Sequence, residues 1–182
     1  MRAPGSIAAP VYSGLVSDLL PDAQITVFAD GSGAYADDPT LNAGLSGLWG
    51  VFDNMPEWEV NNGLTAEDWG IVRFWVQAGQ HDPDIVMARF DYAYDEVQTA
   101  FMTLTGSDTS DLRASIDANE MLIEAEGIDQ HSYTAPGSDH TLVRNDDFYD
   151  MEVNGVRLVD WVTSLVAGEP QADVHCEECE AP

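Results

Sequence analysis

The chain has 182 residues, with 33 acidic side chains, six arginines and no lysine, and its formal net charge is −27. This length fits one ordinary domain or a large piece of a bigger one, and the 45% apolar content is sufficient for a hydrophobic core. So negative a field repels phosphate backbones and anionic lipid headgroups, which disfavours nucleic-acid binding and peripheral membrane attachment. No stretch approaches about 18 consecutive apolar residues, so no membrane span is expected.

Four elements are predicted in the first part of the chain. Apolar residues at helical spacing predict a helix over residues 7–20, which the following proline ends. The apolar run 25–29 (ITVFA) is typical of a buried parallel strand. Residues 37–63, rich in Gly, Asn and Pro, predict at least one short helix and no clear architecture. Thr65 and Asp68 resemble a weakened capping box, which predicts that a helix with an apolar stripe follows them.

Strands and helices alternate in the middle of the chain. The run 84–90 (DIVMARF) predicts a second buried strand, and a short helix is predicted over 96–104. A further helix is predicted over 110–127, with Ser110 as its amino-terminal cap. Residues 130–134 predict a weaker third strand. This alternation predicts an α/β fold class in which three layers form around a parallel sheet.

The last third of the chain differs in pattern. An Asn-Gly pair within residues 151–158 predicts a β-hairpin, since these residues accept the positive φ values of a type I′ turn. A terminal helix is predicted over 159–166. The expected organisation is therefore one domain over residues 1–172, followed by an acidic, frayed tail over 173–182.

The tail carries a C-x-x-C motif formed by Cys176 and Cys179. Such a pair can be half of a zinc site, a redox pair or two thiols whose partners lie elsewhere, and the adjacent His175 strengthens the metal interpretation only slightly. A structural role within the tail is favoured, and the pairing stays open. The acidic cluster at Asp146, Asp147 and Asp150 lacks the Gly and Glu positions of an EF-hand loop, so no metal or cofactor is expected.

Candidate catalytic residues follow the three predicted strands. Functional side chains in a parallel α/β sheet gather beyond the carboxyl ends of the strands, which selects Asp30, Asp95 and His140. An acid followed by a histidine is the chain order of the α/β-hydrolase triad, in which a serine precedes both. Considered alone, Asp30 would fix a turn, Asp95 would cap a helix and His140 would be an ordinary loop histidine.

Three segments, in this order, resemble the pectin acetylesterase and Notum family of secreted carboxylesterases. Residues 25–35 (ITVFADGSGAY) look like the family's strand that leads into an Asp-Ser-Gly turn, and residues 94–98 (YDEVQ) look like the segment that holds the triad acid. Residues 137–144 (GSDHTLVR), with the hairpin and helix that follow, look like the segment that holds the triad histidine. The resemblance implies an α/β-hydrolase fold in which Asp95 is the acid and His140 the base.

The nucleophile is where the sequence departs from the family. The family's serine stands in a Gly-x-Ser-Ala-Gly turn before a helix, and Ala3 occupies the matching position here. Pro4 follows and has no N–H to donate to an oxyanion hole. Ser6 is a weak alternative nucleophile, and Ser13 and Ser32 also lie outside any Gly-x-Ser-x-Gly pattern. The resemblance further implies that the chain is the carboxy-terminal part of such a domain and lacks the amino-terminal half of the sheet.

The resemblance implies a serine carboxylesterase that removes acetyl or another acyl group from a carbohydrate or glycoconjugate, without a cofactor, outside the cell or in its envelope. This chain on its own is expected to be inactive, because the nucleophile position is lost. The alternative is a non-catalytic binding or interaction module that kept the fold, with an exposed apolar patch formed by Trp49, Trp58, Trp69 and Trp75. The expected partners are a small-molecule or glycan ester and, through an exposed sheet edge, a second copy of the chain.

Overall fold

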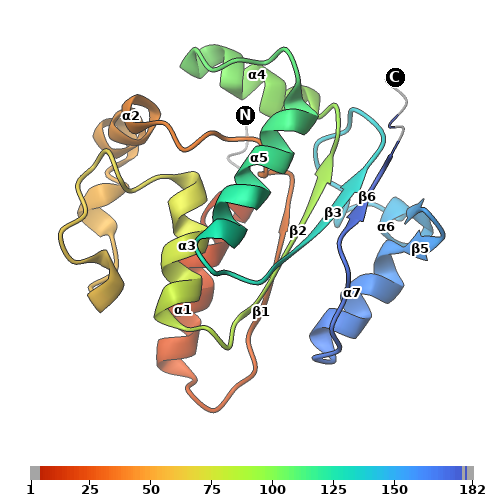
Figure 1. Cartoon of the computed structure of the whole chain (residues 1–182), viewed down its shortest axis with the longest axis horizontal. Coiled ribbons are helices and arrows are strands. Elements are labelled where there is room, and N and C mark those ends of the chain that lie inside the picture. The colour runs from red at the N-terminus through yellow and green to blue at the C-terminus, as the bar shows by residue number, and fades with distance from the viewer. Residues whose placement is uncertain (1–4, 178, 180–182) are drawn as a thin grey trace.

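The computed structural model describes residues 5–177 and 179. Its centre is a four-stranded sheet in the order β1-β2-β3-β6, shown in Figure 1. The strands are β1 (Thr26–Asp30), β2 (Val86–Tyr92), β3 (Gln130–Ala135) and β6 (Val174–His175). Every neighbouring pair in this sheet is parallel, so the carboxyl ends of the strands lie at one edge. The predicted α/β class with a parallel sheet is confirmed.

Helices cover both faces of this sheet (Figure 1). None of the described helices is long and apolar enough to cross a membrane. The helices are α1 (Ala9–Leu19), α2 (Pro39–Trp49), α3 (Ile71–His81), α4 (Glu96–Thr105), α5 (Leu112–Ala125), α6 (Asp147–Asp150) and α7 (Leu158–Val166). Short 3-10 turns occupy Gly5–Ile7, Phe52–Asn54 and Glu59–Asn61, and the predicted hairpin is formed by β4 (Glu152–Val153) and β5 (Val156–Arg157).

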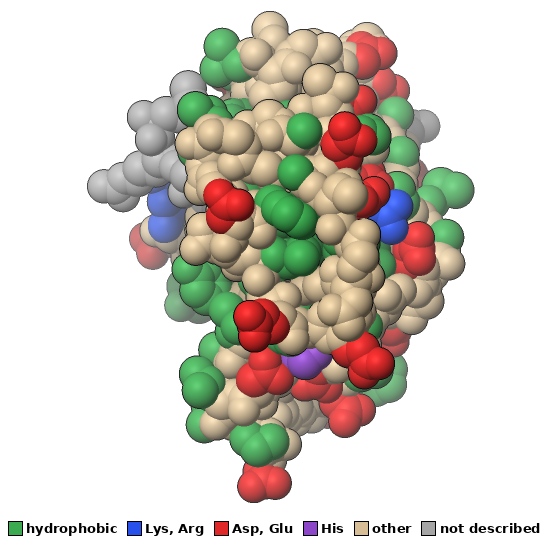
Figure 2. All heavy atoms as spheres, turned by 90° about the vertical axis from the view of Figure 1, so that its left-hand side faces the viewer, with side chains coloured by type: hydrophobic (Ala, Val, Ile, Leu, Met, Phe, Trp, Pro, Cys, Tyr) green, Lys and Arg blue, Asp and Glu red, His purple; other side chains and the backbone are tan. Residues whose placement is uncertain are grey.

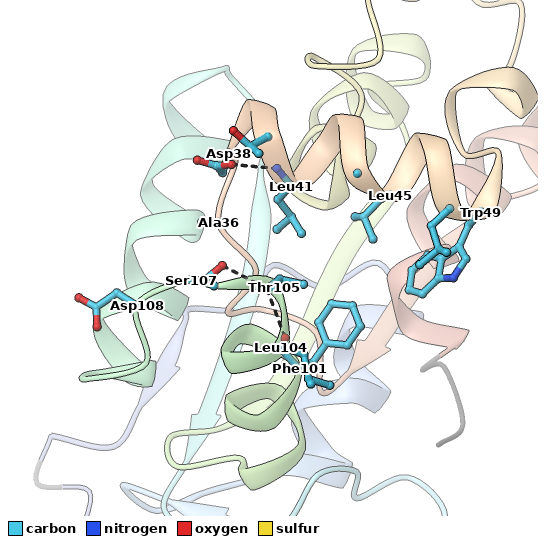
Figure 3. Close-up of a pocket in the computed structure, with 14 residues that line it drawn as sticks. Ala36, Asp38, Leu41, Leu45, Trp49, Phe101, Leu104, Thr105, Ser107 and Asp108 are labelled. Atoms are coloured by element: carbon cyan, nitrogen blue, oxygen red, sulfur yellow. Dashed lines mark hydrogen bonds between the residues drawn. The ribbon is translucent and has the colours of Figure 1, made fainter.

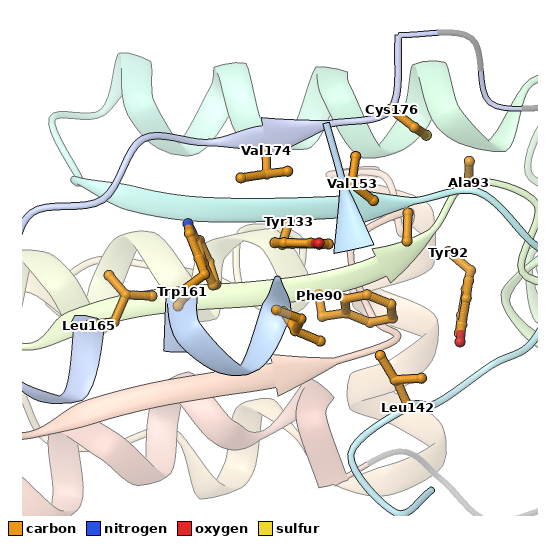
Figure 4. Close-up of a cluster of buried hydrophobic side chains, with 13 residues drawn as sticks. Phe90, Tyr92, Ala93, Tyr133, Leu142, Val153, Trp161, Leu165, Val174 and Cys176 are labelled. Atoms are coloured by element: carbon orange, nitrogen blue, oxygen red, sulfur yellow. The ribbon is translucent and has the colours of Figure 1, made fainter. Parts of the chain in front are cut away.

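The side chains of β2 point alternately to the two faces of the sheet, and each face has its own hydrophobic core. Phe90 packs on the face that α7 covers, where it lies in one cluster with Trp161 and the strand residue Tyr133 (Figure 4). Met87 belongs to the cluster on the opposite face, together with Trp75 of α3. Successive side chains of a strand point to opposite faces, so the continuous apolar run that predicted β2 is what two covered faces require.

Two helices begin at positions that the sequence does not predict. Asp68 accepts hydrogen bonds from the backbone N and the Oγ1 of Thr65, which closes a separate turn instead of opening α3. Helix α3 begins after Gly70, at Ile71, three residues beyond Asp68. Helix α2 begins within the unclear region, where the Asp38 side chain accepts from the backbone N of Leu41. Local capping chemistry is therefore present at both places, but only at Asp38 does it start a helix.

The predicted frayed tail is wrong for its first residues. Val174 and His175 pair with β3 as the fourth strand, and Asp173 accepts a hydrogen bond from the backbone N of Ser132. Cys176 donates its backbone N–H to β3, and its thiol forms a disulfide with Cys179. Pairing with β3 and burial of Val174 in the core order this acidic segment. Such tertiary contacts cannot be predicted from the local composition of the segment.

The predicted exposed tryptophan patch is also wrong. Trp58, Trp69 and Trp75 are 5%, 1% and 2% exposed, and only Trp49, at 48%, reaches the surface among the four. Trp75 packs between α3 and the sheet, and Trp58 stacks on the imidazole of His81 with ring centroids 4.3 Å apart. These side chains build the interior of the first half of the chain.

Candidate active site

The structure brings together the residues that follow the three predicted strands. Asp30 ends β1, Asp95 stands between β2 and α4, and His140 lies in the loop after β3. The His140 Nδ1 lies 2.8 Å from Asp95 Oδ2, so the proximity predicted for these two side chains is confirmed. Both lie beyond the carboxyl ends of adjacent parallel strands, where functional groups of α/β folds gather.

Asp95 is fully buried and accepts four hydrogen bonds. Its Oδ1 accepts from the backbone N of Val97 at 2.8 Å and of Gln98 at 2.9 Å, which caps α4. Its Oδ2 accepts from the Gln98 side chain at 3.0 Å and from His140. The same carboxylate therefore caps α4 through Oδ1 and binds His140 through Oδ2. The interpretation of Asp95 as a cap and its interpretation as a triad acid are compatible.

Asp30 holds the loop that carries His140. Its Oδ2 accepts from the backbone N of Leu142 and of Val143, both at 2.9 Å. Asp30 thus acts as the predicted acceptor of backbone N–H groups, although these groups come from the histidine loop. Burial raises the pKa of Asp30, and the two backbone donors partly offset that effect.

Gly31 lets β1 and the histidine loop approach closely. Its φ of +79° lies in the left-handed region, and a Cβ at this position would collide with the carbonyl oxygen of His140. The same Cβ would lie 3.1 Å from the imidazole Nδ1. A residue without a side chain is therefore required beside the imidazole.

The environment of His140 suits a proton acceptor. Its hydrogen bond to Asp95 raises the pKa of His140, against an opposing effect of burial, and the charges of Asp95, Asp30 and Asp91 raise it further. The bond assigns the neutral tautomer with a proton on Nδ1, so the lone pair sits on Nε2. The side chain of His140 is 17% exposed, so part of it is accessible to solvent.

Gln98 supports Asp95 from a second direction; it ends the YDEVQ segment, but no role is predicted for it from the sequence. Its Nε2 donates to Asp95 Oδ2 and to Asp91 Oδ1, and its Oε1 accepts from the backbone N of Ala34 at 3.0 Å. Asp91 Oδ1 also accepts from the backbone N of Gly33 at 2.8 Å. The turn after β1 is thereby fixed to the carboxylate that orients His140.

A buried arginine extends this hydrogen-bond network to helix α5 on one face of the sheet. Arg89 is 2% exposed, and its guanidinium donates to Glu120 at 3.2 Å, to Ser132 at 3.3 Å and to the carbonyl of Gly33. Burial raises the pKa of Asp91 to about 6, although Arg89, 3.7 Å away, lowers it. The signal in the sequence was an arginine and an aspartate inside an otherwise apolar strand, where charged residues need buried partners.

No serine hydroxyl among the described residues forms a hydrogen bond with His140. Ala3, the position that matches the family nucleophile, lies outside the described residues. The Ser6 hydroxyl is buried in the 3-10 turn before α1, with no hydrogen-bond partner in the described part of the chain. Ser13 donates to the carbonyl of Pro10, and Ser32 is 3% exposed in the turn after β1.

A mostly apolar groove of about 790 Å³ separates α2 from the second half of α4 (Figure 3). Leu48, Trp49 and Leu104 line it and are 74%, 48% and 72% exposed. Phe101 and Leu104 lie on the helix that Asp95 caps, roughly 9–14 Å along its axis from the cap. Apolar side chains also show in the middle of the face that carries α2, with acidic side chains around them (Figure 2).

Within the described residues, the groups that could hold a metal ion do not include Asp95 or His140. These groups are formed by residues of α5 with His175 in β6 and with Asp173 just before it. The Asp95–His140 pair is an imidazole hydrogen-bonded to a buried carboxylate, an arrangement that can take up and release a proton.

No protein-family model matches the chain, and no curated protein matches it significantly.

Proposed function

We propose that Asp95 and His140 are the acid and the base of a serine carboxylesterase of the α/β-hydrolase type. The observation that carries the proposal is the 2.8 Å contact between His140 Nδ1 and the fully buried carboxylate of Asp95, beyond the ends of adjacent parallel strands. A triad needs a carboxylate on Nδ1 to hold the imidazole tautomer and a free Nε2 to accept a proton. The order of acid and histidine along the chain agrees with this type.

In the proposed reaction, His140 Nε2 takes the proton of a serine hydroxyl as the oxygen attacks the ester carbonyl. It then gives that proton to the leaving alkoxide, which leaves an acyl-enzyme. A water molecule, deprotonated by the same nitrogen, releases the acid in the second half of the cycle. Asp95 stabilises the imidazolium in both halves.

The proposed substrate is an acyl ester of a carbohydrate or glycoconjugate, on the basis of the resemblance. The net charge of −27 favours an uncharged substrate over a polyanionic one, because like charges repel at low salt. A location outside the cell or in its envelope is part of the proposal, and the Cys176–Cys179 disulfide is in keeping with an oxidising compartment.

The chain on its own is proposed to be inactive, because Ala3 and Pro4 stand where the family has its nucleophile and the following N–H donor. A chain with Ala3→Ser and Pro4→Ala restores both groups. We expect it to hydrolyse an aryl acetate at least about tenfold faster than the wild-type chain, since a positioned base contributes a factor of that order or more. Replacing His140 by Ala in this variant should remove the gain.

Three outcomes would contradict the proposal in different ways. No gain from Ala3→Ser and Pro4→Ala would mean that the nucleophile is misplaced, and a gain that survives His140→Ala would exclude His140 as the base. Robust turnover by the wild-type chain that Ser6→Ala abolishes would identify Ser6 as the nucleophile.

A non-catalytic binding module is the second candidate, and the groove between α2 and α4 favours it. The groove exposes Trp49 and two leucines, which suits an apolar group carried by a saccharide. Under this candidate Trp49→Ala abolishes binding of an acylated saccharide in calorimetry, and His140→Ala leaves binding unchanged. The active-site variant with a restored serine then gains no hydrolysis.

A further inference from the structure

His175 faces away from the disulfide motif beside it. Val174 of β6 and Cys176, which follows the strand, are buried in the core beneath α7, and the side chain of His175 between them points to α5 on the other face of the sheet. In the sequence, His175 gives only slight support to a zinc site at the two cysteines, and a structural role of the cysteines is favoured. The cysteines are joined in a disulfide and cannot act as thiolate ligands, so any ligand set of His175 must come from α5.

Two carboxylates of α5 meet this imidazole. Asp117 and Glu120 are three residues apart, which places them on one face of the helix. One donor atom from each of Asp117, Glu120 and His175 lies within 4.8 Å of the other two, and His175 Nε2 is 3.2 Å from Glu120 Oε1. Side chains from two elements, 55 or more residues apart in the chain, therefore converge on one point.

The three side chains line a hollow of about 270 Å³ in the surface, with Arg113 and Met121 at its border. Glu120 is 7% exposed, and Arg89 holds its other oxygen at 3.2 Å, so one oxygen stays directed at His175. The Nδ1 of His175 is buried, which leaves Nε2 as the nitrogen that a ligand in the hollow can reach.

The charge around the hollow favours a cation. Glu124 and Asp173 form a second acidic group with Glu120, within the same 4.8 Å limit. Burial, and then the charges of Glu120 and Asp173, raise the pKa of Glu124, as expected where carboxylates crowd together. Two arginines are nearby counter-charges: Arg89, which lies 3.2 Å from Glu120, and Arg113, whose Nε lies 3.8 Å from Asp117. The side chain of Arg113 is one-third exposed, so it can move aside.

We propose that Asp117, Glu120 and His175 bind one divalent transition-metal ion, best matched by Zn²⁺, at a site separate from the Asp95–His140 pair. One imidazole and two carboxylates are a ligand set that zinc accepts, with a fourth position left for water from the hollow. Metal–ligand bonds of about 2.1 Å place tetrahedral donor atoms roughly 3.4 Å apart. The present spacing reaches this with a small rotation of Asp117, which is partly exposed.

The test is a calorimetric titration of the full chain with ZnCl₂ in a buffer without reductant, so that the disulfide stays closed. We expect one Zn²⁺ per chain, and a dissociation constant that rises at least tenfold in His175→Gln and in Asp117→Asn, because even changes to outer-shell partners cost that much. Co²⁺ in place of Zn²⁺ should give the visible absorption of a four-coordinate ion.

Control variants distinguish zinc binding at this site from nonspecific zinc binding by the many other carboxylates of the chain. His131→Gln and Asp147→Asn change a histidine and a carboxylate outside the cluster and should leave zinc binding unchanged. Absence of binding, or equal loss of affinity in these controls, would overturn the proposal. Should His175→Gln unfold the chain, Asp117→Asn decides, because its side chain is surface-accessible: unchanged affinity in this folded variant would also overturn the proposal.

Discussion

The carboxylate of Asp95 receives hydrogen bonds from the helix that it caps and from the histidine that it orients. Oδ1 is taken by two backbone N–H groups of α4, and Oδ2 by Gln98 and His140. Changing the acid therefore alters the imidazole more than it alters the cap. An Asn at this position can still accept from α4 through its oxygen, but it turns an NH₂ group toward His140.

We predict that Asp95→Asn lowers the pKa of His140. The hydrogen bond to Asp95 is the largest cause of the raised pKa, and the neutral amide can neither accept that bond in the same geometry nor supply its charge. The measurement is an NMR titration of the four histidine Cε1–H signals. His175 is the internal control, because Glu120 sets its pKa and should keep it raised. An unchanged His140 pKa would show that the contact with Asp95 is not formed in solution.

The same pKa has a consequence for stability. A histidine whose pKa is raised on folding stabilises the folded state fully below its unfolded pKa of about 6.5, and this contribution is lost as pH rises through the raised value. In Asp95→Asn this part of the pH dependence should disappear from urea unfolding curves.

A substitution at Gln98 tests how much the buried hydrogen-bond network contributes to stability. Gln98→Leu removes three hydrogen bonds and leaves the backbone N of Ala34 and oxygens of Asp91 and Asp95 without these partners. We expect a loss of about 3 kcal/mol in the free energy of unfolding, measured by urea denaturation. Gln80→Leu, on the exposed surface of α3, should change it by less than about 0.5 kcal/mol. Equal effects of the two substitutions would contradict the role of Gln98.

Some residues of the candidate site could be predicted from the sequence, and others could not. Asp95 and His140 could be predicted because chain order and strand ends constrain where an acid and a base can meet. The partners of Gln98, Arg89 and Asp91 could not, because these partners come from a turn and a helix far away in the chain. The charges of Arg89 and Asp91 inside an apolar strand indicate that buried partners exist, but only the tertiary fold decides which residues they are.

Among the elements, those with a clear local signal, an apolar run or an Asn-Gly turn, were predictable, and β6, which has no such signal, was not. Strands β1, β2 and β3 each lie within two residues of their predicted bounds. Continuous apolar runs mark β1 and β2, as burial between two covered faces requires, whereas β3 (QHSYTA) is largely polar and gives the weaker prediction. Strand β6 has two residues and is ordered by pairing with β3 and by burial of Val174, neither of which its acidic local sequence indicates. Helix α3 begins late because the Thr65–Asp68 bonds are satisfied within a turn of their own.

The disulfide that follows β6 should stabilise the chain modestly. It closes a loop of only four residues, from Cys176 to Cys179, so the entropy that it removes from the unfolded chain corresponds to about 2 kcal/mol. We predict this loss for the double variant Cys176→Ala and Cys179→Ala in urea denaturation. Reductant should destabilise the wild-type chain by a similar amount and leave the double variant unchanged. A much larger effect would mean that the bond supports more than its own loop.

Across the whole molecule, the negative charge is interrupted at one edge of the sheet. Strand β1 is the outermost strand, and the adjacent helix α1 exposes Tyr12 and Leu19 at 64% and 78%. Residues 5–17 and 23–29 carry no charge. An unpaired edge beside apolar side chains is a template for association, whereas the −27 charge of the chain opposes it.

We predict that the chain self-associates increasingly as salt rises, because screening removes the repulsion and leaves the edge unprotected. Light scattering across a salt series measures this. Leu19→Glu should suppress the association, and Leu104→Glu, equally exposed on α4, should not. A chain that stays monomeric at high salt, or that responds equally to both substitutions, would contradict this role of the β1 edge.

The central claim is that His140, oriented by Asp95, is the base of an ester-hydrolysing site. It is tested most directly by the pH dependence of kcat/KM for an aryl acetate in the chain with Ala3→Ser and Pro4→Ala. The claim predicts that the rate rises with pH through one ionisation above about 6.5, at the pKa that NMR gives for His140, and that Asp95→Asn moves both values down together. A rate without this ionisation, or a midpoint that does not follow the pKa of His140, would contradict it.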